Sequence, residues 1–290
     1  MRIAVLDIGG TSIKSGVIED GALCERRETP SEAKRGGGHL MHLAGEVIAG
    51  YSDFDAIGIS TAGQVDSDAG VIRYANQNIP DYTGMPVGRM FEERFRVPVS
   101  VENDVNAAAM GELIFGAGKE ATGGNFLCIT YGTGIGGAVV LDGKVFKGAS
   151  CSAGEFGHII THGGVRDKFG YYEDYASAKA LLRAVQGILP QVDSGRDLFA
   201  QLGNPAVKAV FDAWVEEVLY GLASLIHVFN PSLVVLGGRI MEESCVIEAL
   251  RERLSAHIMP SFADVILAPA KLGNDAGLWG MAHIASLMVL

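Results

Sequence analysis

Two glycine-rich turns carry residue types that could bind a phosphate group. The first reads Asp7-Ile8-Gly9-Gly10-Thr11 and follows an apolar run that ends in an aspartate. A tight turn of this kind presents backbone N–H groups that form an anion-binding nest, Thr11 adds a hydroxyl donor, and Asp7 could hold Mg²⁺ through water. The alternative is an ordinary β-turn capped by an aspartate. Both interpretations are open for this turn taken alone.

The second turn, Tyr131-Gly132-Thr133-Gly134-Ile135-Gly136-Gly137, has four glycines in the six positions from Gly132. A hairpin does not require so many glycines, whereas backbone that lies close to a polyanion does. Two such turns together favour phosphate binding. A third turn, Leu236-Gly237-Gly238-Arg239, follows an apolar strand and could let the backbone approach an adenine or a ribose. By itself it could equally be a turn at the end of a strand.

Hairpins must position the first two turns. An apolar strand at Ile3–Ile8, a return strand at Ser12–Ile18 and the turn dipeptide Asp20-Gly21 predict one hairpin unit. The same pattern recurs with strands at Phe126–Thr130 and Ala138–Leu141 and the dipeptide Asp142-Gly143. From Gly21 to Gly143 is 122 positions, so the pattern suggests an internal duplication. We expect two similar half-domains that face each other across a cleft.

The remaining pattern alternates strands and helices. We expect strands at Ala56–Ser60, Val99–Glu102, Leu233–Leu236 and Val265–Ala268, and helices at Val87–Arg96, Asn106–Phe115, Ser177–Gly187, Ala206–Phe229, Cys245–His257 and Ala276–Leu290. This alternation predicts an α/β fold with mixed sheets. The initial hairpin excludes a doubly wound nucleotide-binding fold, which needs a helix directly after its first strand.

Composition limits the class of protein further. The chain has 290 residues, 48% of them hydrophobic, and a formal charge of −11. The acidity argues against binding to nucleic acid, which needs surfaces rich in Lys and Arg. The four cysteines are widely spaced and predict no disulfide framework. The sequence contains no apolar run long enough to span a membrane and no pattern of a signal peptide. We therefore expect a cytoplasmic protein without a membrane partner.

The three turns, in this order, resemble the two phosphate motifs and the adenosine motif of the actin/hexokinase/Hsp70 superfamily. Within it the chain resembles the ROK family of bacterial sugar kinases and sugar-responsive repressors, because Val101-Glu102-Asn103-Asp104-Val105-Asn106 and Gly154-Glu155-Phe156-Gly157-His158 are also present. The resemblance implies two ribonuclease H-like (actin-like ATPase) domains, α/β in class, flanking a central cleft. We expect residues 1–105 with the C-terminal helix 276–290 in one domain and residues 106–275 in the other. ATP would be bound by Asp7, Gly9, Gly10, Thr11, Gly132, Thr133, Gly134, Gly237 and Gly238, with Mg²⁺ near Asp7.

The segment at Asn103-Asp104 ends a predicted strand and opens an alanine-rich helix. A helix N-cap explains one of these polar residues, but it does not explain Glu102, Asn103, Asp104 and Asn106 together. The resemblance implies that Asp104 is the general base, which accepts a proton as a sugar hydroxyl attacks the γ-phosphate of ATP. It also implies that Asn103 holds neighbouring hydroxyls of the sugar.

Further sugar-binding residues follow from the same resemblance. Glu155 and His158 are three positions apart in a glycine-flanked loop, so both can point into one pocket, and the family implies that they contact the sugar near C1–C3. Glu173 matches the family's last sugar-binding acid, although taken alone it could be a solvated acid at the start of a helix. Gly63 and Asn78 are additional candidates, and either could simply be a loop residue.

The sequence departs from the family in one segment. ROK proteins commonly carry a Cys-x-Cys-Gly-x-x-Gly-Cys zinc motif after this histidine, whereas Ile159–Phe169 contains no cysteine and Tyr171 stands at the place of the last one. Since a structural Zn²⁺ needs about four ligands, we predict that the chain binds no zinc. Four aromatic residues would replace the metal by packing, or would form a wall for a larger sugar: Phe169, Tyr171, Tyr172 and Tyr175.

The sequence therefore predicts an ATP-dependent sugar kinase that phosphorylates a hexose hydroxyl, at C6 by expectation, of glucose or a glucoside. An N-acetylmannosamine or N-acetylglucosamine kinase is the alternative. A non-catalytic sugar sensor is a more distant one, because the intact Asp104 and both phosphate turns favour catalysis and Asp7 leaves no room before it for a DNA-binding module. The resemblance also implies a homodimer.

Overall fold

The computed structural model describes residues 1–163 and 170–289, arranged as two compact units. The first unit holds Met1–Lys119, Lys144–Ala153 and Asn274–Leu290, and the second holds Glu120–Gly143 and Gly154–Gly273. The predicted division differs from these units in residues 106–119, 144–153 and 274–275, which lie in the first unit. In the parts of the chain described, no helix combines the length and the apolar character that crossing a membrane requires.

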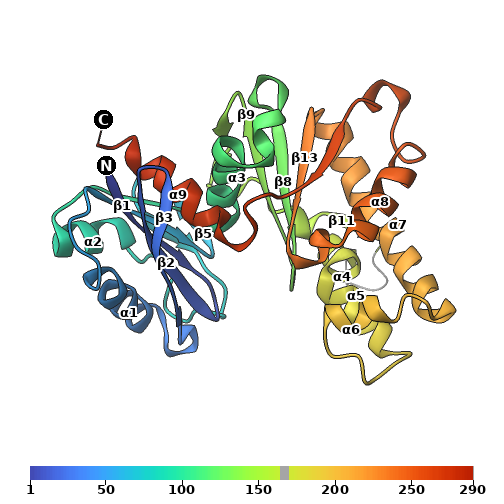
Figure 1. Ribbon diagram of the computed structural model, residues 1–290, viewed down its shortest axis with the longest axis horizontal. Coiled ribbons are helices and arrows are strands. Elements are labelled where there is room, and N and C mark those ends of the chain that lie inside the picture. Colours follow the sequence, from blue (N-terminus) through green and yellow to red (C-terminus); the bar gives the residue numbers. More distant parts are fainter. Residues whose placement is uncertain (164–169, 290) are drawn as a thin grey trace. The chain divides into compact units, whose positions relative to one another are not determined.

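The first unit is built on a mixed sheet with the strand order β3-β2-β1-β4-β7, of which Figure 1 labels β1, β2 and β3. Its strands are β1 (Arg2–Ile8), β2 (Ser12–Glu19), β3 (Ala22–Pro30), β4 (Ala56–Thr61) and β7 (Val99–Asn103). The pairs β1–β2 and β2–β3 are antiparallel, whereas β4 runs parallel to β1 and β7 runs parallel to β4. The other elements are α1 (Gly37–Ala49), α2 (Val87–Phe95), α3 (Asp104–Phe115), α9 (Ala276–Ser286), the hairpin β5 (Gln64–Asp66) and β6 (Val71–Tyr74), and the short strand β10 (Lys144–Val145).

The two faces of this sheet have separate cores. Side chains alternate along a strand, so Ala4, Leu6 and Ile8 of β1 pack with residues of α1 and α2, while Ile3 and Val5 pack with α3 and α9. Asp7 shares the alternation of Ile3 and Val5. The helices α3 and α9 approach so closely that a Cβ on Gly280 would overlap the carbonyl oxygen of Ala107. This packing places α3 in the first unit.

The second unit is built on β8 (Phe126–Tyr131), β9 (Ile135–Leu141), β13 (Leu233–Gly237) and β14 (Ile266–Pro269), which follow one another in the order β9-β8-β13-β14. The pair β8–β9 is antiparallel, and β13 and β14 continue the sheet in parallel. The order β2-β1-β4-β7 of the first unit is the same arrangement of a hairpin followed by two parallel strands. The predicted α/β fold with two mixed sheets is confirmed.

Helices surround the sheet of the second unit and bury its main core. They are α4 (Tyr172–Ala176), α5 (Ala178–Gln186), α6 (Gly195–Ala200), the long α7 (Pro205–Phe229) and α8 (Ser244–Leu254), together with the 3₁₀ turn η4 (Phe156–His158) and the ribbon β11 (Ile160–His162) and β12 (Gly170–Tyr171). The helix α7 begins at a proline, with Asn204 as its N-cap, and is followed by Asn230, which adopts a left-handed conformation. Its buried stripe includes Phe211, Trp214 and Leu222.

One element differs from the prediction near the second glycine turn. Strand β9 already starts at Ile135, so Gly136 and Gly137 are strand residues that pair with Thr130 and Ile129. Gly137 is required for packing, because a Cβ there would overlap the ring of Phe156. The turn itself is limited to Gly132–Gly134. Gly136 and Gly137 therefore belong to the strand, and the predicted ATP-binding positions Gly132, Thr133 and Gly134 make up the turn.

Candidate active site

The first glycine turn presents a carboxylate with two hydrogen-bonding partners. The Oδ1 atom of Asp7 accepts a hydrogen bond from the Ser60 hydroxyl at 2.9 Å, and Oδ2 lies 3.1 Å from the Lys14 ammonium. The Gly9 amide closes the turn by donating to the Ser12 carbonyl oxygen at 2.9 Å, while Gly10 and Thr11 are exposed. The turn thus leaves Gly10 and Thr11 accessible beside a carboxylate that is held in place.

The end of β7 and the start of α3 hold Asn103 and Asp104 in one hydrogen-bonded group. The side-chain oxygen of Asn103 caps α3 by accepting from the amides of Val105 at 2.9 Å and Asn106 at 3.1 Å. Its amide nitrogen donates to Asp104 Oδ1 and to the Gly63 carbonyl oxygen, both at 2.9 Å. Asn103 is therefore an N-cap that also orients the neighbouring carboxylate.

Asp104 itself is partly accessible, and its Oδ1 accepts a second hydrogen bond from the Val105 amide at 2.9 Å. Burial of the carboxyl group, followed by the negative charge of Asp7, raises the pKa of Asp104 to about 6. The hydrogen bonds from Val105 and Asn103 oppose this shift. A carboxyl group with a pKa close to neutral pH is suited to general-base catalysis.

The buried carboxylate of Glu102 accepts hydrogen bonds from two residues near Asp104. Its Oε1 accepts from the Asn103 amide at 2.9 Å and from the Asn106 side-chain amide at 3.1 Å.

Of the two additional sugar-binding candidates, Gly63 contributes the carbonyl oxygen that Asn103 binds. Asn78 is exposed, and its amide donates to the Asn76 side chain at 3.0 Å. The structure brings Gly63 to Asn103, but it gives Asn78 no contact with Asn103 or Asp104.

In the second unit, the glycine turn after β8 is exposed at Gly132 and Thr133. The Gly132 amide donates to the Gly134 carbonyl oxygen at 2.9 Å, and the Gly132 carbonyl oxygen accepts from the Lys179 amide at 3.2 Å. The third turn follows β13, where Gly237 is buried and Gly238 lies against the Tyr131 carbonyl oxygen. Backbone of the second and third turns therefore meets at the end of β8.

The predicted sugar-binding acids of the second unit differ in their surroundings. Glu155 and His158 are more than half exposed, and His158 Nδ1 lies 3.8 Å from Glu155 Oε2. Glu173 is partly buried, and its Oε2 accepts a hydrogen bond from the Ile135 amide at 3.1 Å. The spacing of Glu155 and His158 does bring them together. Glu173 instead contacts the backbone directly after the glycine turn.

Aromatic side chains contact one another in the segment after His158, where other ROK proteins commonly carry the zinc motif. The ring of His158 packs edge-on against Tyr171, with centroids 5.4 Å apart, and His162 stacks on Tyr175 at 4.0 Å. The buried Tyr172 hydroxyl lies 2.8 Å from that of Tyr131 and donates to the Val218 carbonyl oxygen at 2.7 Å. Phe169 lies outside the described residues. Among residues 1–163 and 170–289, no group of three or more His, Cys, Asp or Glu side chains could hold a metal ion.

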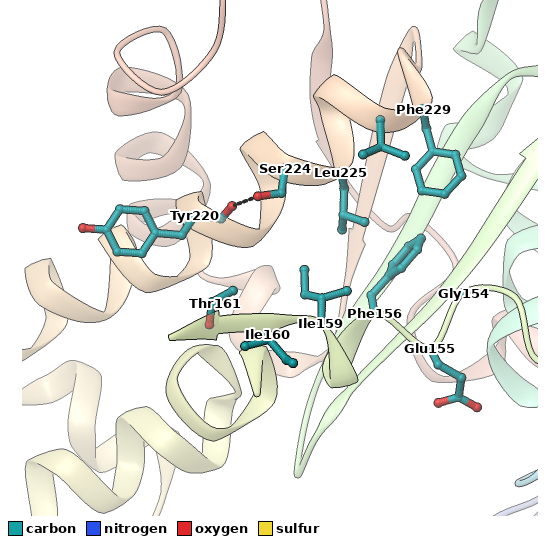
Figure 2. Close-up of a pocket in the computed structure, with 11 residues that line it drawn as sticks. Gly154, Glu155, Phe156, Ile159, Ile160, Thr161, Tyr220, Ser224, Leu225 and Phe229 are labelled. Carbon is teal, nitrogen blue, oxygen red and sulfur yellow. Dashed lines mark hydrogen bonds between the residues drawn. The ribbon is translucent and has the colours of Figure 1, made fainter. Parts of the chain in front are cut away.

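A cavity of about 490 Å³ lies between η4, β11 and α7. Figure 2 shows Ile159, Ile160, Leu225 and Phe229 around it, with the carboxylate of Glu155 directed away from these side chains. Because its walls are mainly apolar, the cavity offers few partners for the hydroxyls of a sugar. We do not assign it to the sugar.

The chain is similar to known proteins over nearly its whole length. The sequence profile of the ROK family matches residues 3–287. The β-glucoside kinase of Klebsiella pneumoniae is 32% identical over 98% of this chain and 95% of its own length. The crystal structure of the ROK hexokinase of Thermus thermophilus is 33% identical, with a TM-score of 0.83 over 100% of this chain and 99% of its own.

This chain belongs to the ROK family. A ROK glucokinase of Streptomyces griseus, solved in complex with glucose and AMPPNP, is 29% identical, with a TM-score of 0.83 over 99% of this chain and 100% of its own. The predicted family and enzyme class are confirmed, and the chain is a carbohydrate kinase. The assignments of individual residues in this ROK kinase remain predictions.

Two residues that contact Asp7 were absent from the sequence prediction. Lys14 and Ser60 both bind the Asp7 carboxylate. The hairpin register pairs Asp7 with Lys14 across β1 and β2, and the parallel register places Ser60 beside Asp7. A hairpin centred on Gly10-Thr11 could have indicated Lys14 from the sequence. Ser60 depends on the register between β1 and β4, which the local pattern does not contain.

Proposed function

We propose that this ROK kinase transfers the γ-phosphate of ATP to the C6 hydroxyl of glucose or of a β-glucoside. The observation that carries the proposal is the Asp104 carboxylate, which Asn103 and Val105 orient and whose pKa is raised to about 6. The glucokinase and the β-glucoside kinase among the relatives support the choice of sugar.

The reaction needs one proton acceptor and precise positioning. Because Oδ1 of Asp104 accepts the hydrogen bonds of Asn103 and Val105, we assign Oδ2 to the sugar hydroxyl. As the hydroxyl oxygen forms its bond to the γ-phosphorus, its proton passes to Oδ2 and the bond from the γ-phosphorus to the bridging oxygen of ADP breaks. The Asn103 amide keeps the carboxylate in the required orientation.

We assign nucleotide binding to the three glycine turns and sugar binding to the polar residues that the family resemblance indicates. The exposed backbone at Gly10–Thr11 and Gly132–Thr133 would contact phosphates, and Gly237-Gly238 would contact the adenosine. Asn103, Glu155, His158 and Glu173 would bind the hydroxyls of the sugar. Gly63 contributes through its bond to Asn103, and Asn78 stays a candidate from sequence alone.

The residues around Asp7 fit a Mg²⁺ ion held through water. The carboxylate is partly accessible and fixed by Ser60, and carboxylate oxygens are ligands that Mg²⁺ favours. When bound, the ion would neutralise charge on the transferred phosphate. Asp7 would hold its water shell, while Lys14 keeps the carboxylate oriented.

A coupled assay of ADP release tests the proposal. The panel contains glucose, mannose, N-acetylmannosamine, N-acetylglucosamine and cellobiose, each at saturating MgATP. We expect turnover on glucose or on the β-glucoside cellobiose, and NMR of the product should place the phosphate at C6. Turnover confined to the N-acetylhexosamines would contradict the proposed substrate, and ADP release from no sugar would contradict the proposed reaction.

We also propose a homodimer, which the family resemblance supports. One chain has a mass of 30.5 kDa, so light scattering after size exclusion should give about twice that mass for a C2 dimer. A monomer at micromolar concentration would contradict it.

A further inference from the structure

Glu173 lies where two loops of the second unit meet. One is the glycine turn, Gly132–Gly134, which leads into Ile135. The other is the acidic loop, Gly154–His158, which carries Glu155 and His158. The Glu173 carboxylate contacts the backbone of both, because its Oε2 accepts from the Ile135 amide at 3.1 Å and a Cβ on Gly157 would lie 2.7 Å from the same oxygen.

The glycines on either side leave no spare room around this carboxylate. A Cβ on Gly134 would overlap Oε2 of Glu173, and a Cβ on Gly157 would also lie 2.5 Å from the Ile135 carbonyl oxygen. Protein atoms do not tolerate such approaches without a shift of the backbone. The backbone at Gly134 and Gly157 therefore lies directly against the Glu173 carboxylate, and a displacement of the glycine turn would change or break the hydrogen bond from the Ile135 amide.

The helix that carries Glu173 is fixed from the opposite side. In α4, the buried Tyr172 hydroxyl donates to the Val218 carbonyl oxygen at 2.7 Å, and its amide donates to the Ile159 carbonyl oxygen at 2.8 Å. The Trp214 indole donates to the Ala176 carbonyl oxygen at 3.0 Å. Both ends of α4 are thus attached to neighbouring elements, so the backbone of Glu173 stays in place while its side chain responds to the loops.

We propose that Glu173 couples sugar binding to nucleotide binding, as a positioning residue for the glycine turn. The inference rests on the proposed function, in which the acidic loop binds the sugar and the glycine turn binds phosphate. A sugar hydroxyl that donates to Glu173 Oε1 fixes the carboxylate, and Oε2 then fixes the Ile135 amide and the turn before it. By linkage, each ligand increases the affinity for the other by the same factor.

Calorimetry of sugar binding measures this factor. The dissociation constant of glucose, or of the sugar turned over fastest in the panel, is determined with and without saturating AMPPNP and Mg²⁺. The ratio of the two constants is the coupling factor, which we expect to be about fivefold or more in the wild-type chain. In Glu173→Ala the coupling factor should fall to near one. Glu173→Gln, which keeps an acceptor oxygen for the Ile135 amide, should retain part of it.

Glu155→Gln is the matched control, because Glu155 is the other acid assigned to the sugar but has no bond to the glycine turn. This variant should bind sugar more weakly and keep the wild-type coupling factor. A wild-type chain that phosphorylates sugar with a coupling factor of one, or a Glu173→Ala variant that keeps the wild-type factor, would overturn the coupling alone. A wild-type chain that binds none of the sugars would overturn the proposed function and the coupling with it. Thermal unfolding of each variant checks that it is folded.

Discussion

The two groups of residues assigned to the substrate are built in opposite ways. Asn103 and Asp104 are partly buried and joined to each other, to Gly63 and to the start of α3 by hydrogen bonds of 2.9 to 3.1 Å. Glu155 and His158 are more than half exposed; their side chains lie 3.8 Å apart, and the His158 ring also packs against Tyr171. The group to which we assign the chemistry is therefore held in position by the protein itself, whereas the group to which we assign sugar recognition has few protein partners.

This difference has an energetic basis. A general base must lie within hydrogen-bonding distance of one proton, so a misplaced carboxylate reduces the rate directly. Glu155 and His158 lose little solvation in the chain without bound sugar, and an ion pair at an exposed position adds little stability. Substitutions in the first group should therefore change kcat and stability, and substitutions in the second should change mainly the affinity for sugar.

The largest expected effect comes from Asp104→Asn. The amide keeps the shape of the side chain but cannot accept the proton, so kcat should fall by about 10² to 10⁴. The dissociation constant of the sugar should change little. Asp193→Asn, the same substitution at an exposed position, is the matched control and should leave kcat unchanged. Steady-state kinetics with calorimetry separates the two constants. An Asp104→Asn variant that keeps a tenth of the wild-type kcat would show that another group is the base.

The pH dependence tests the same carboxylate without a substitution. Only ionised Asp104 can accept a proton, and its raised pKa of about 6 moves the acidic limb of kcat/KM upward from the usual range of an aspartate. Activity should therefore fall about tenfold per pH unit below pH 6. The sign is opposite for stability, because the folded chain takes up this proton at a higher pH than the unfolded chain and so gains stability from Asp104 as the pH falls through 6. An acidic limb near pH 4 would contradict the assignment.

Glu155→Gln tests the group formed by the exposed residues Glu155 and His158. Replacing one charged hydrogen-bond partner of the sugar should raise the KM for sugar about tenfold, which corresponds to about 1.4 kcal/mol. Because the side chain is 53% exposed, the free energy of unfolding should stay within about 0.5 kcal/mol of the wild-type value. Initial rates and urea unfolding measure the two quantities. A loss of stability comparable to that of a buried substitution would remove the contrast between the two groups.

A fourth prediction concerns stability in the buried group. Asn103→Ala removes the cap of α3 and should lower the free energy of unfolding by about 1 kcal/mol, with a loss of activity. Asn204 caps α7 in the same way, by accepting from the Ala206 amide at 3.0 Å. Asn204→Ala should cost a similar free energy and leave kcat unchanged. Equal losses of activity in both variants would mean that Asn103 acts only through the stability of its helix.

The sequence predicted the contacts between neighbouring residues of the two groups, but not the contacts between residues far apart in the chain. The pairing of Glu155 with His158 and the cap at Asn103 follow from local spacing, and the structure contains both contacts. The contact of Glu173 with the glycine turn joins residues 38 positions apart, and the bond from Ser60 to Asp7 joins residues 53 apart. Such contacts depend on how helices and strands pack, and no local pattern contains that information. For the same reason, the sequence alone does not show that Gly137 makes room for the ring of Phe156.

The smallest effect is expected from a chelator, because we predict that no zinc stabilises the acidic loop and the ribbon that follows it. The ribbon β11–β12 pairs Ile160 with Tyr171, and the edge of His158 packs on the Tyr171 ring, so this loop has contacts that do not need zinc. Aromatic pairs of this kind contribute about 0.5 to 1.5 kcal/mol, far less than a structural zinc site. Treatment with a strong chelator followed by dialysis should leave the Tm unchanged, whereas Tyr171→Ala should lower it by a few degrees. Elemental analysis that finds one zinc per chain, together with a fall of Tm in chelator, would show that a metal still holds the loop. That result would place the recognition group among the preformed parts of the site and remove its contrast with Asp104.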